Sequence, residues 1–381
     1  MDSEDDVTVR MADWLTYTDI EQLKQLNRFY GGVVSDHHSK HDLICAVLRK
    51  VGKKSSLDQM VVDLSPSQHR FMQLIILDHS PSYTMEELLA KGRAALQNDQ
   101  GEPRSLVVGA LKRGWLFTGY SHRTQYLYHI PSDLREQMTD LFIRPFLNDI
   151  EVLLRPPSFY RNEEGQLVKD LYRFLDLIRK EVLRLTLDGA IHKQQQKQLL
   201  KTFVINEDVI NQKGPRFGFG RMYHLYPDRF SLLYDYAFYK GYFRENKENL
   251  SLTDIGNGYL YKNDSNADKQ LYRFWIRLYR KPIPHLPIIL RWIGLLSRSK
   301  WMPTEQIYKA VNEWISPYYY ESQESLFRKT IQMLVHLGIL QFGVEQDQSL
   351  VKLTQSGVKW MHGISAFREQ VIEEGFIKSG K

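Results

Sequence analysis

Hydrophobic positions between residues 324 and 337 recur every three or four residues, which is the spacing of one face of an α-helix. This apolar face consists of Leu326, Phe327, Ile331, Leu334, Val335 and Leu337. Arg328, Lys329 and Gln332 fall at intervening positions. The pattern predicts a helix with a buried side and a basic outer side.

The hydrophobic period changes at Gly338, directly after this helix. Residues 339–342 and 350–353 are predicted strands, separated by a polar tip. The phrase Leu353-Thr354-Gln355-Ser356-Gly357 then predicts a new helix with Thr354 as its N-cap. Helix, glycine, hairpin and helix in this order are typical of a winged helix-turn-helix, in which an exposed helix enters a DNA groove and the hairpin flanks it.

The same order of signals occurs twice more along the chain. In residues 65–138, three predicted helices are followed by Gly114 and a predicted hairpin. In residues 230–256, a helix is followed by Gly241, a hairpin and the phrase Leu252-Thr253-Asp254-Ile255-Gly256. A repeat of roughly 100 residues is too long for a solenoid unit and favours an array of small domains. The sequence predicts a mainly α fold with small β-hairpins, arranged as tandem winged helix-turn-helix domains.

The amino-terminal region carries a different pattern. Residues 18–26 predict a short helix capped by Thr18, and Ser39 predicts the cap of a second helix with Leu43 and Val47 on its apolar side. Two short helices joined by an extended loop resemble the SAP-type helix-extended-helix element, which binds DNA. Basic residues around the second helix fit that resemblance. They are Lys40, Arg49, Lys50, Lys53 and Lys54.

A linker is predicted at Arg155-Pro156-Pro157-Ser158, because consecutive prolines do not continue a helix. The chain is too long for one ordinary core, so several domains are expected. The predicted segments are an acidic tail with a SAP-like element at 1–60, winged helix 1 at 61–154, a winged-helix-like domain 2 at 155–262, and winged helix 3 at 263–381.

Composition narrows the class of protein. With 43% hydrophobic and 25% charged residues the chain is globular, and no apolar run reaches the roughly 20 residues that span a bilayer, so no membrane partner is expected. The acidic start, MDSEDDVTVR, is unlike a signal peptide, which predicts a cytoplasmic and nucleoid-associated protein. The single cysteine, Cys45, forms no internal disulfide, and we expect neither a metal nor a cofactor.

Positive charge is clustered, although the net charge is only +6. Residues 269–300 contain no Asp or Glu, and Arg273, Arg277, Arg280 and Lys281 fall near one helix face within this run. Such a cluster suits contact with DNA phosphates. The alternative is an amphipathic core helix whose arginines pair with acidic residues elsewhere.

Further candidate DNA contacts come from the predicted third helices, the first hairpin tip and two basic segments of the middle region. They are Arg104, Lys112, Arg113, Arg123, Lys193, Lys197, Arg216, Arg328 and Lys329. Because most of these would meet phosphates, binding should depend steeply on salt concentration.

No catalytic motif in the sequence has the neighbouring elements that its chemistry requires. A phosphate-binding GxxxxGK[ST] loop is missing. Pro227-Asp228 with Glu245-Asn246-Lys247 imitates the metal site of restriction-type nucleases, but the residues between them have a helical period, whereas that site needs two carboxylates on adjacent strands. We therefore expect the protein not to be an enzyme.

The segment Arg184-Leu185-Thr186-Leu187-Asp188-Gly189 follows a long predicted helix and precedes a basic one at 192–203. It is similar to the helicase-associated domain that precedes the motor of the DNA-repair helicase XPB. The resemblance implies DNA binding and service to a helicase or repair protein, without catalysis. This chain has no motor, so any remodelling of DNA would need that partner.

The sequence thus predicts a non-catalytic protein that binds duplex or forked DNA as an accessory to a helicase or to a repair and remodelling complex. Two alternatives stay open. One is a winged-helix transcription regulator, and the other is a protein-interaction scaffold that does not bind DNA, because winged helices also dock proteins.

Overall fold

The computed structural model describes residues 9–32, 39–51, 54–78, 80–147, 155–211, 216–262, 264–319, 321–363, 366–373 and 375–376. The chain forms two compact units, Met1–Asp149 (unit 1) and Ile150–Lys381 (unit 2), and both are mainly helical with small antiparallel sheets. The predicted boundary at 154/155 lies close to this division. The predicted boundaries at 60/61 and 262/263 fall inside the units.

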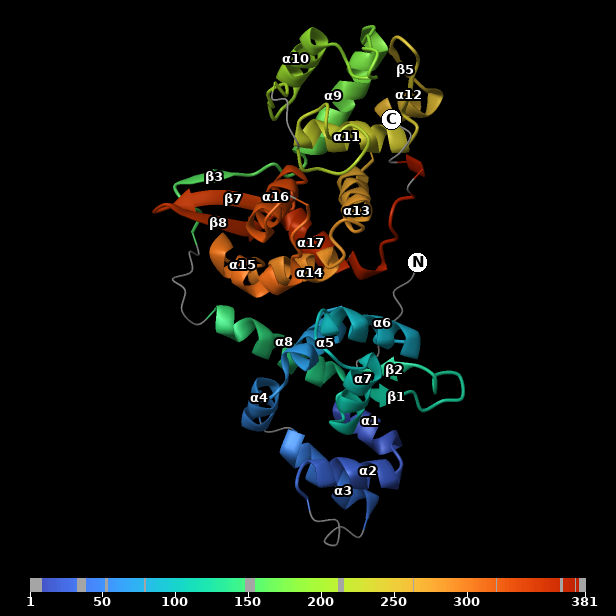
Figure 1. Cartoon of the computed structure of the whole chain (residues 1–381), viewed down its shortest axis with the longest axis vertical. Helices are drawn as coiled ribbons and strands as arrows, with labels where there is room; N and C mark the ends of the chain where they lie inside the picture. The colour runs from blue at the N-terminus through green and yellow to red at the C-terminus, as the bar shows by residue number, and fades with distance from the viewer. Residues whose placement is uncertain are drawn as a thin grey trace. The chain divides into compact units, whose positions relative to one another are not determined.

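Unit 1 contains eight helices and one hairpin in its described part (Figure 1). The elements are α1 (Met11–Tyr17), α2 (Ile20–Phe29), α3 (Lys40–Val51), α4 (Lys54–Val62), α5 (Pro66–Ile76), α6 (Met85–Leu96), α7 (Pro103–Lys112), β1 (Phe117–Thr118), β2 (Tyr128–His129) and α8 (Ser132–Ile143), which continues into the 3-10 turn Arg144–Phe146. The N-terminal helices pack on the rest of the unit, since α1 contacts α8 and α2 contacts α7.

The helix starts follow local capping chemistry. Ser65 and Thr84 each accept a hydrogen bond from the backbone N–H three residues later. The prediction that Thr18 caps a helix was wrong. Asp19 accepts from the Gln22 N–H at 2.8 Å, while the Thr18 hydroxyl donates to the Trp14 carbonyl at 2.8 Å, because the preceding helix α1 ends there.

Unit 2 carries two further hairpins and a four-stranded sheet. Its elements are β3 (Phe159–Arg161), α9 (Gln166–Lys180), α10 (Lys193–Thr202), α11 (Asp228–Tyr239), β4 (Phe243–Glu245), β5 (Leu250–Leu252), α12 (Asp254–Leu260), α13 (Ala267–Tyr279), α14 (Leu286–Leu296), β6 (Met302–Pro303), α15 (Thr304–Val311), η3 (Asn312–Trp314), α16 (Gln323–His336), β7 (Leu340–Glu345), β8 (Gln348–Leu353), α17 (Gln355–Gly363) and η4 (Ala366–Arg368). The sheet order is β3-β7-β8-β6, and Figure 1 shows β3 beside the longer β7–β8 hairpin.

One arrangement occurs three times: a helix, a short extended segment, two helices and a hairpin. The helices are α5, α6 and α7 in the first copy, α9, α10 and α11 in the second, and α14, α15 and α16 in the third. In each copy the extended segment pairs with the second hairpin strand. Tyr83 pairs with Tyr128, the Leu250 N–H donates to the Leu183 carbonyl, and Met302 pairs with Val351. The repeat predicted from the sequence is therefore an architectural one.

The repeated Leu-Thr-x-x-Gly phrase forms the joint between a hairpin and the next helix. The Thr253 hydroxyl donates to the Gly241 carbonyl at 2.6 Å and accepts from the Gly256 N–H at 3.1 Å. The Thr354 hydroxyl likewise donates to the Gly338 carbonyl at 2.6 Å and accepts from a backbone N–H three residues later at 2.9 Å. Threonine therefore ties the end of the third helix to the start of the following one, as its predicted capping role requires.

A buried cluster of charged residues joins the second and third copies. Arg229 is fully buried on α11, and its guanidinium lies 2.6 Å from an Asp170 oxygen and 3.4 Å from a Glu163 oxygen. His336, on α16, lies 3.2 Å from the same carboxylate of Glu163. Burial opposes ionisation of Glu163, but the His336 hydrogen bond and the nearby positive charges lower its pKa overall. The cluster holds α11 against α16.

A second buried carboxyl group lies beside the β4–β5 hairpin. Asp235 is fully buried and accepts a hydrogen bond from the Arg221 backbone N–H at 2.7 Å. The Arg221 guanidinium is engaged by Glu245 through two bonds of 3.0 and 2.8 Å. Burial raises the pKa of Asp235 to about 7, against the opposing effect of the Arg221 hydrogen bond and charge.

We expect Gly256→Ala to destabilise unit 2 by about 1–3 kcal/mol, the usual cost of forcing extra volume into a packed site. An added Cβ would overlap the Tyr242 carbonyl oxygen. Gly258→Ala in the same helix is the control, since its Cβ meets no atom within 4 Å and alanine favours helices. Urea unfolding measures both variants. Equal midpoints would show that the joint tolerates a side chain at position 256.

Asp235 should also make stability depend on pH. The folded protein keeps a proton on this carboxyl group up to about pH 7, whereas the unfolded chain releases it near the ordinary pKa of 3.8. Its stabilising contribution is therefore complete below about pH 4 and declines as the pH rises to about 7. Asp235→Asn should lack this decline, so its unfolding free energy relative to the wild type should rise over that range. Parallel pH profiles for the two proteins would contradict the raised pKa.

Candidate nucleic-acid interface

The third helix of the first copy, α7, has an exposed face that carries positive charge. Arg104, Val108 and Lys112 are exposed and four residues apart, so they form one stripe along the helix. Leu106 and Val107 are buried on the opposite side. Arg104 and Lys112 have no polar partner within the described residues, so both cations are available to a ligand.

The β1–β2 hairpin extends the same surface, and Figure 1 shows its loop projecting from the rest of unit 1. Hydrogen bonds between Ser121 and Thr124 hold the tip. Arg123 is exposed on this tip and has no polar partner in the part of the chain that the structure describes. The predicted contacts Arg104, Lys112 and Arg123 therefore all lie on exposed parts of the first copy.

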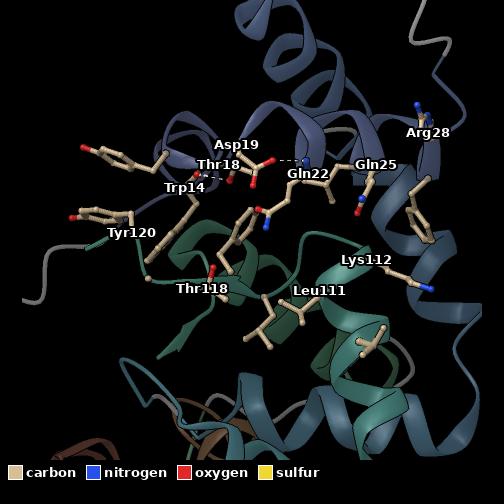
Figure 2. A pocket seen from close by; sticks show the side chains of 17 residues that line it. Trp14, Thr18, Asp19, Gln22, Gln25, Arg28, Leu111, Lys112, Thr118 and Tyr120 are labelled. Atoms are coloured by element: carbon tan, nitrogen blue, oxygen red, sulfur yellow. Dashed lines mark hydrogen bonds between the residues drawn. The ribbon is translucent and has the colours of Figure 1, made fainter. Parts of the chain in front are cut away.

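A groove of about 850 Å³ separates α1 and α2 from α7 and β1 (Figure 2). Gln22, Gln25 and Arg28 follow one another along α2 and form one wall. Leu111 and Lys112 of α7 contribute to the facing wall. The groove therefore combines an apolar base with amides and two cations.

The two ends of the groove differ in chemistry. Figure 2 shows Trp14 and Tyr120 at one end and Arg28 and Lys112 at the other. The rings of Tyr17 and Tyr120 stack with centroids 4.2 Å apart, although both are exposed, at 58% and 59%. Trp14 lines the groove and is only 5% exposed, yet its indole N–H has no acceptor among the described residues.

Arg113, another predicted DNA contact, has a structural role. Its guanidinium lies over the Phe29 ring at 5.6 Å and the Trp115 ring at 5.4 Å, and it donates to the Gly109 carbonyl at 3.0 Å. The Tyr30 hydroxyl donates to the Arg113 carbonyl at 2.6 Å. These contacts fix the end of α2 next to the end of α7, and thereby the width of the groove.

The basic run of α13 lies against a distant segment of the chain, although Arg273 stays partly exposed. Arg273 pairs with Glu369 at 2.6 Å, Arg277 donates to the Gln370 carbonyl at 3.2 Å, and Arg280 donates to the Glu369 carbonyl. The three arginines share one face, as their spacing predicts. That face is occupied by residues after η4, while Lys281 is exposed.

The third helices of unit 2 are mostly buried. Residues 229–237 of α11 are all buried. On α16, Arg328 is exposed beside Glu324 at 3.9 Å, and Lys329 pairs with Glu321 at 2.8 Å. The two candidate contacts of the third copy, Arg328 and Lys329, therefore each lie next to an acidic side chain.

The remaining predicted DNA contacts are either exposed or bound to other residues of the chain. Lys193 and Lys197 are exposed on one side of α10. Arg216 instead pairs with Asp228 and donates to the Tyr223 and Tyr226 carbonyls at 2.7 and 2.6 Å. Arg216, predicted as a DNA contact, therefore binds the start of α11 instead of extending into solvent. Residues 212–215 lie outside the described residues.

The resemblance to a nuclease site disappears in three dimensions. Asp228, at the start of α11, binds Arg216. Glu245, on β4, binds Arg221. Each carboxylate is thus neutralised by its own arginine. Among the described residues, no three His, Cys, Asp or Glu side chains are placed to hold a metal ion together.

The sequence patterns did not predict the groove. Gln22, Gln25 and Arg28 are three residues apart, which marks them as one helix face but says nothing of what that face meets. The contact of α2 with α7 joins segments about eighty positions apart. Only the folded chain shows that the polar face of α2 lies opposite the third helix of the first copy.

Comparison with protein-family models, with curated proteins and with solved structures finds no match to this chain. No helix in the described ranges has the length and apolar character needed to cross a membrane.

A charge swap tests whether Arg273 serves the fold or a ligand. Arg273→Glu should set two carboxylates against each other and destabilise unit 2 by roughly 1 kcal/mol, the upper range for a partly exposed pair. Adding Glu369→Arg should restore most of this loss at an unchanged net charge. Urea unfolding and DNA affinity are measured for both. If the double variant is as stable as the wild type but binds DNA less tightly, Arg273 belongs to the DNA-binding surface.

Proposed function

We propose that unit 1 contains a winged helix-turn-helix that binds duplex DNA, with α7 as the recognition helix and the β1–β2 hairpin as the wing. The exposed face of α7 carries the proposal. Its stripe of Arg104, Val108 and Lys112 is open and unpaired within the described residues, whereas α11 is buried and α16 exposes Glu324 next to Arg328. The short extended segment at Tyr83 supports the winged-helix interpretation, because its single β-bridge to Tyr128 places it beside the second strand of the hairpin.

Arg104, Lys112 and Arg123 would bind phosphates from α7 and the wing. Such contacts position a protein on DNA without reading its sequence, and each released counterion makes binding depend on salt. Together with the resemblance to a helicase-associated domain, this favours a non-catalytic accessory that holds DNA for a helicase or repair partner. Unwinding would be the partner's activity.

A protein-docking role for unit 2 is the second candidate. Its support is the burial of α11 and the acidic Glu324 beside Arg328 on the exposed side of α16, which both disfavour these third helices as groove-binding elements. In that case unit 2 would carry the partner and unit 1 the DNA. The two proposals are compatible within one chain.

Charge reversal tests the DNA-binding surface. Arg104→Glu, Lys112→Glu and Arg123→Glu should each weaken binding to a labelled duplex, and each should lower the slope of log affinity against log salt by about one. Fluorescence anisotropy at several salt concentrations measures both quantities.

Arg93→Glu is the matched control for this series. Arg93 is exposed on α6 in the same unit and lies outside the groove and the α7 stripe. Its reversal changes the net charge by the same amount as each of the three surface variants. Equal losses of affinity in Arg93→Glu and in the three surface variants would show that net charge alone drives binding, and would remove α7 from the interface.

A further inference from the structure

The groove between α2 and α7 has features that duplex binding does not use. Its walls carry the side-chain amides of Gln22 and Gln25, which are exposed and have no partner within the described residues. An amide offers a donor and an acceptor side by side, which matches the edge of an unpaired base. Trp14 lines the same groove, and its buried indole N–H has no acceptor among the described residues.

Aromatic rings at one end of the groove provide surfaces for stacking. Tyr17 and Tyr120 stack on each other while more than half exposed, and Trp14 lies beside them. Exposed aromatic rings next to a basic surface are the usual means by which proteins hold single-stranded nucleic acid, because every base has a π-face. Rings that only completed a core would be buried.

The other end of the groove is cationic. Arg28 and Lys112 lie there, and neither has a polar partner in the described residues. The single acidic residue that lines the groove, Asp19, accepts the Gln22 N–H as the N-cap of α2. The phosphate of a bound nucleotide could therefore contact the cations while its base contacts the amides and rings. An apolar peptide helix would leave Gln22, Gln25 and both cations unsatisfied.

Lys112 connects the two surfaces. It belongs to the exposed stripe of α7 and also lines the groove. A strand that leaves a duplex bound on α7 would therefore enter the groove next to a residue already in contact with its phosphates. The volume of about 850 Å³ lies within the range of roughly 300–1,000 Å³ that is typical of ligand sites.

We propose that this groove binds an unpaired nucleotide at the junction between duplex and single-stranded DNA. The inference rests on the proposed duplex binding by α7 and adds its preferred target. In this arrangement Gln22 and Gln25 contact the base edge, the aromatic end stacks on the base, and Arg28 and Lys112 hold the adjoining phosphate.

The experiment compares the full chain on two labelled DNAs, a blunt duplex and the same duplex with a single-stranded extension, in both polarities. The wild type should bind one extended duplex at least about fivefold more tightly than the blunt one, the lower end of what stacking one base contributes. Gln22→Ala/Gln25→Ala and Tyr17→Ala/Tyr120→Ala should each bring this ratio close to one. A 2-aminopurine at the first unpaired position should change its fluorescence with the wild type and not with these variants.

Gln100→Ala/Gln137→Ala is the matched control, because both glutamines are exposed in unit 1 outside the groove. It should keep the wild-type ratio, and thermal unfolding checks that every variant is folded. Equal wild-type affinity for blunt and extended duplexes would overturn the inference, and the groove would then be a site for an apolar partner. The proposed function would not be affected by this result. A preference that survives in the groove variants would also overturn the inference. Failure to bind either DNA at low salt would instead refute the proposed function.

Discussion

The fully buried Arg229 determines how two helices of unit 2 pack. Its charge is compensated by Glu163 and Asp170, and His336 of α16 binds the same Glu163. Removing charges from water is costly, so such a cluster tolerates only an arrangement in which every member is paired. That arrangement packs α11 against α16. As a result α11 is an interior helix, whereas α16 keeps one exposed side, on which Arg328 lies beside Glu324.

The candidate cations differ in whether the chain itself binds them. Arg273, Arg280 and Arg216 of unit 2 bind carboxylates and carbonyls of the chain. Arg104 and Arg123 of unit 1 extend from α7 and the β1–β2 hairpin without a partner among the described residues. Arginine serves both purposes well because its planar group makes several directed hydrogen bonds. Charge clustering in the sequence therefore marks the basic residues, while their pairing decides which of them can meet a phosphate.

In the proposed binding of an unpaired nucleotide, the groove would add selectivity to a surface that charge alone would leave unselective. Phosphate contacts are available along any duplex, so a purely electrostatic module would bind everywhere on DNA. Stacking rings and amides beside α7 would direct the same module to places where a base is unpaired. Arg113 and Tyr30 keep this groove open at a fixed width, since they join the ends of α2 and α7. Such places are where a helicase or repair partner works.

The sequence by itself determined the features that depend on neighbouring residues. Periodicity predicted most helices, glycine marked the start of each hairpin, and Thr354 was recognisable as a cap because its capping bond lies three positions away. The shared face of Arg273 and Arg277 also followed from spacing. What those faces contact was decided by the tertiary structure, since Arg273 meets Glu369 96 positions away and His336 meets Glu163 173 positions away. The groove in unit 1 depends on the same kind of contact, because Tyr30 meets Arg113 83 positions away. No local pattern encodes such pairings, because the residues that meet are distant in the sequence.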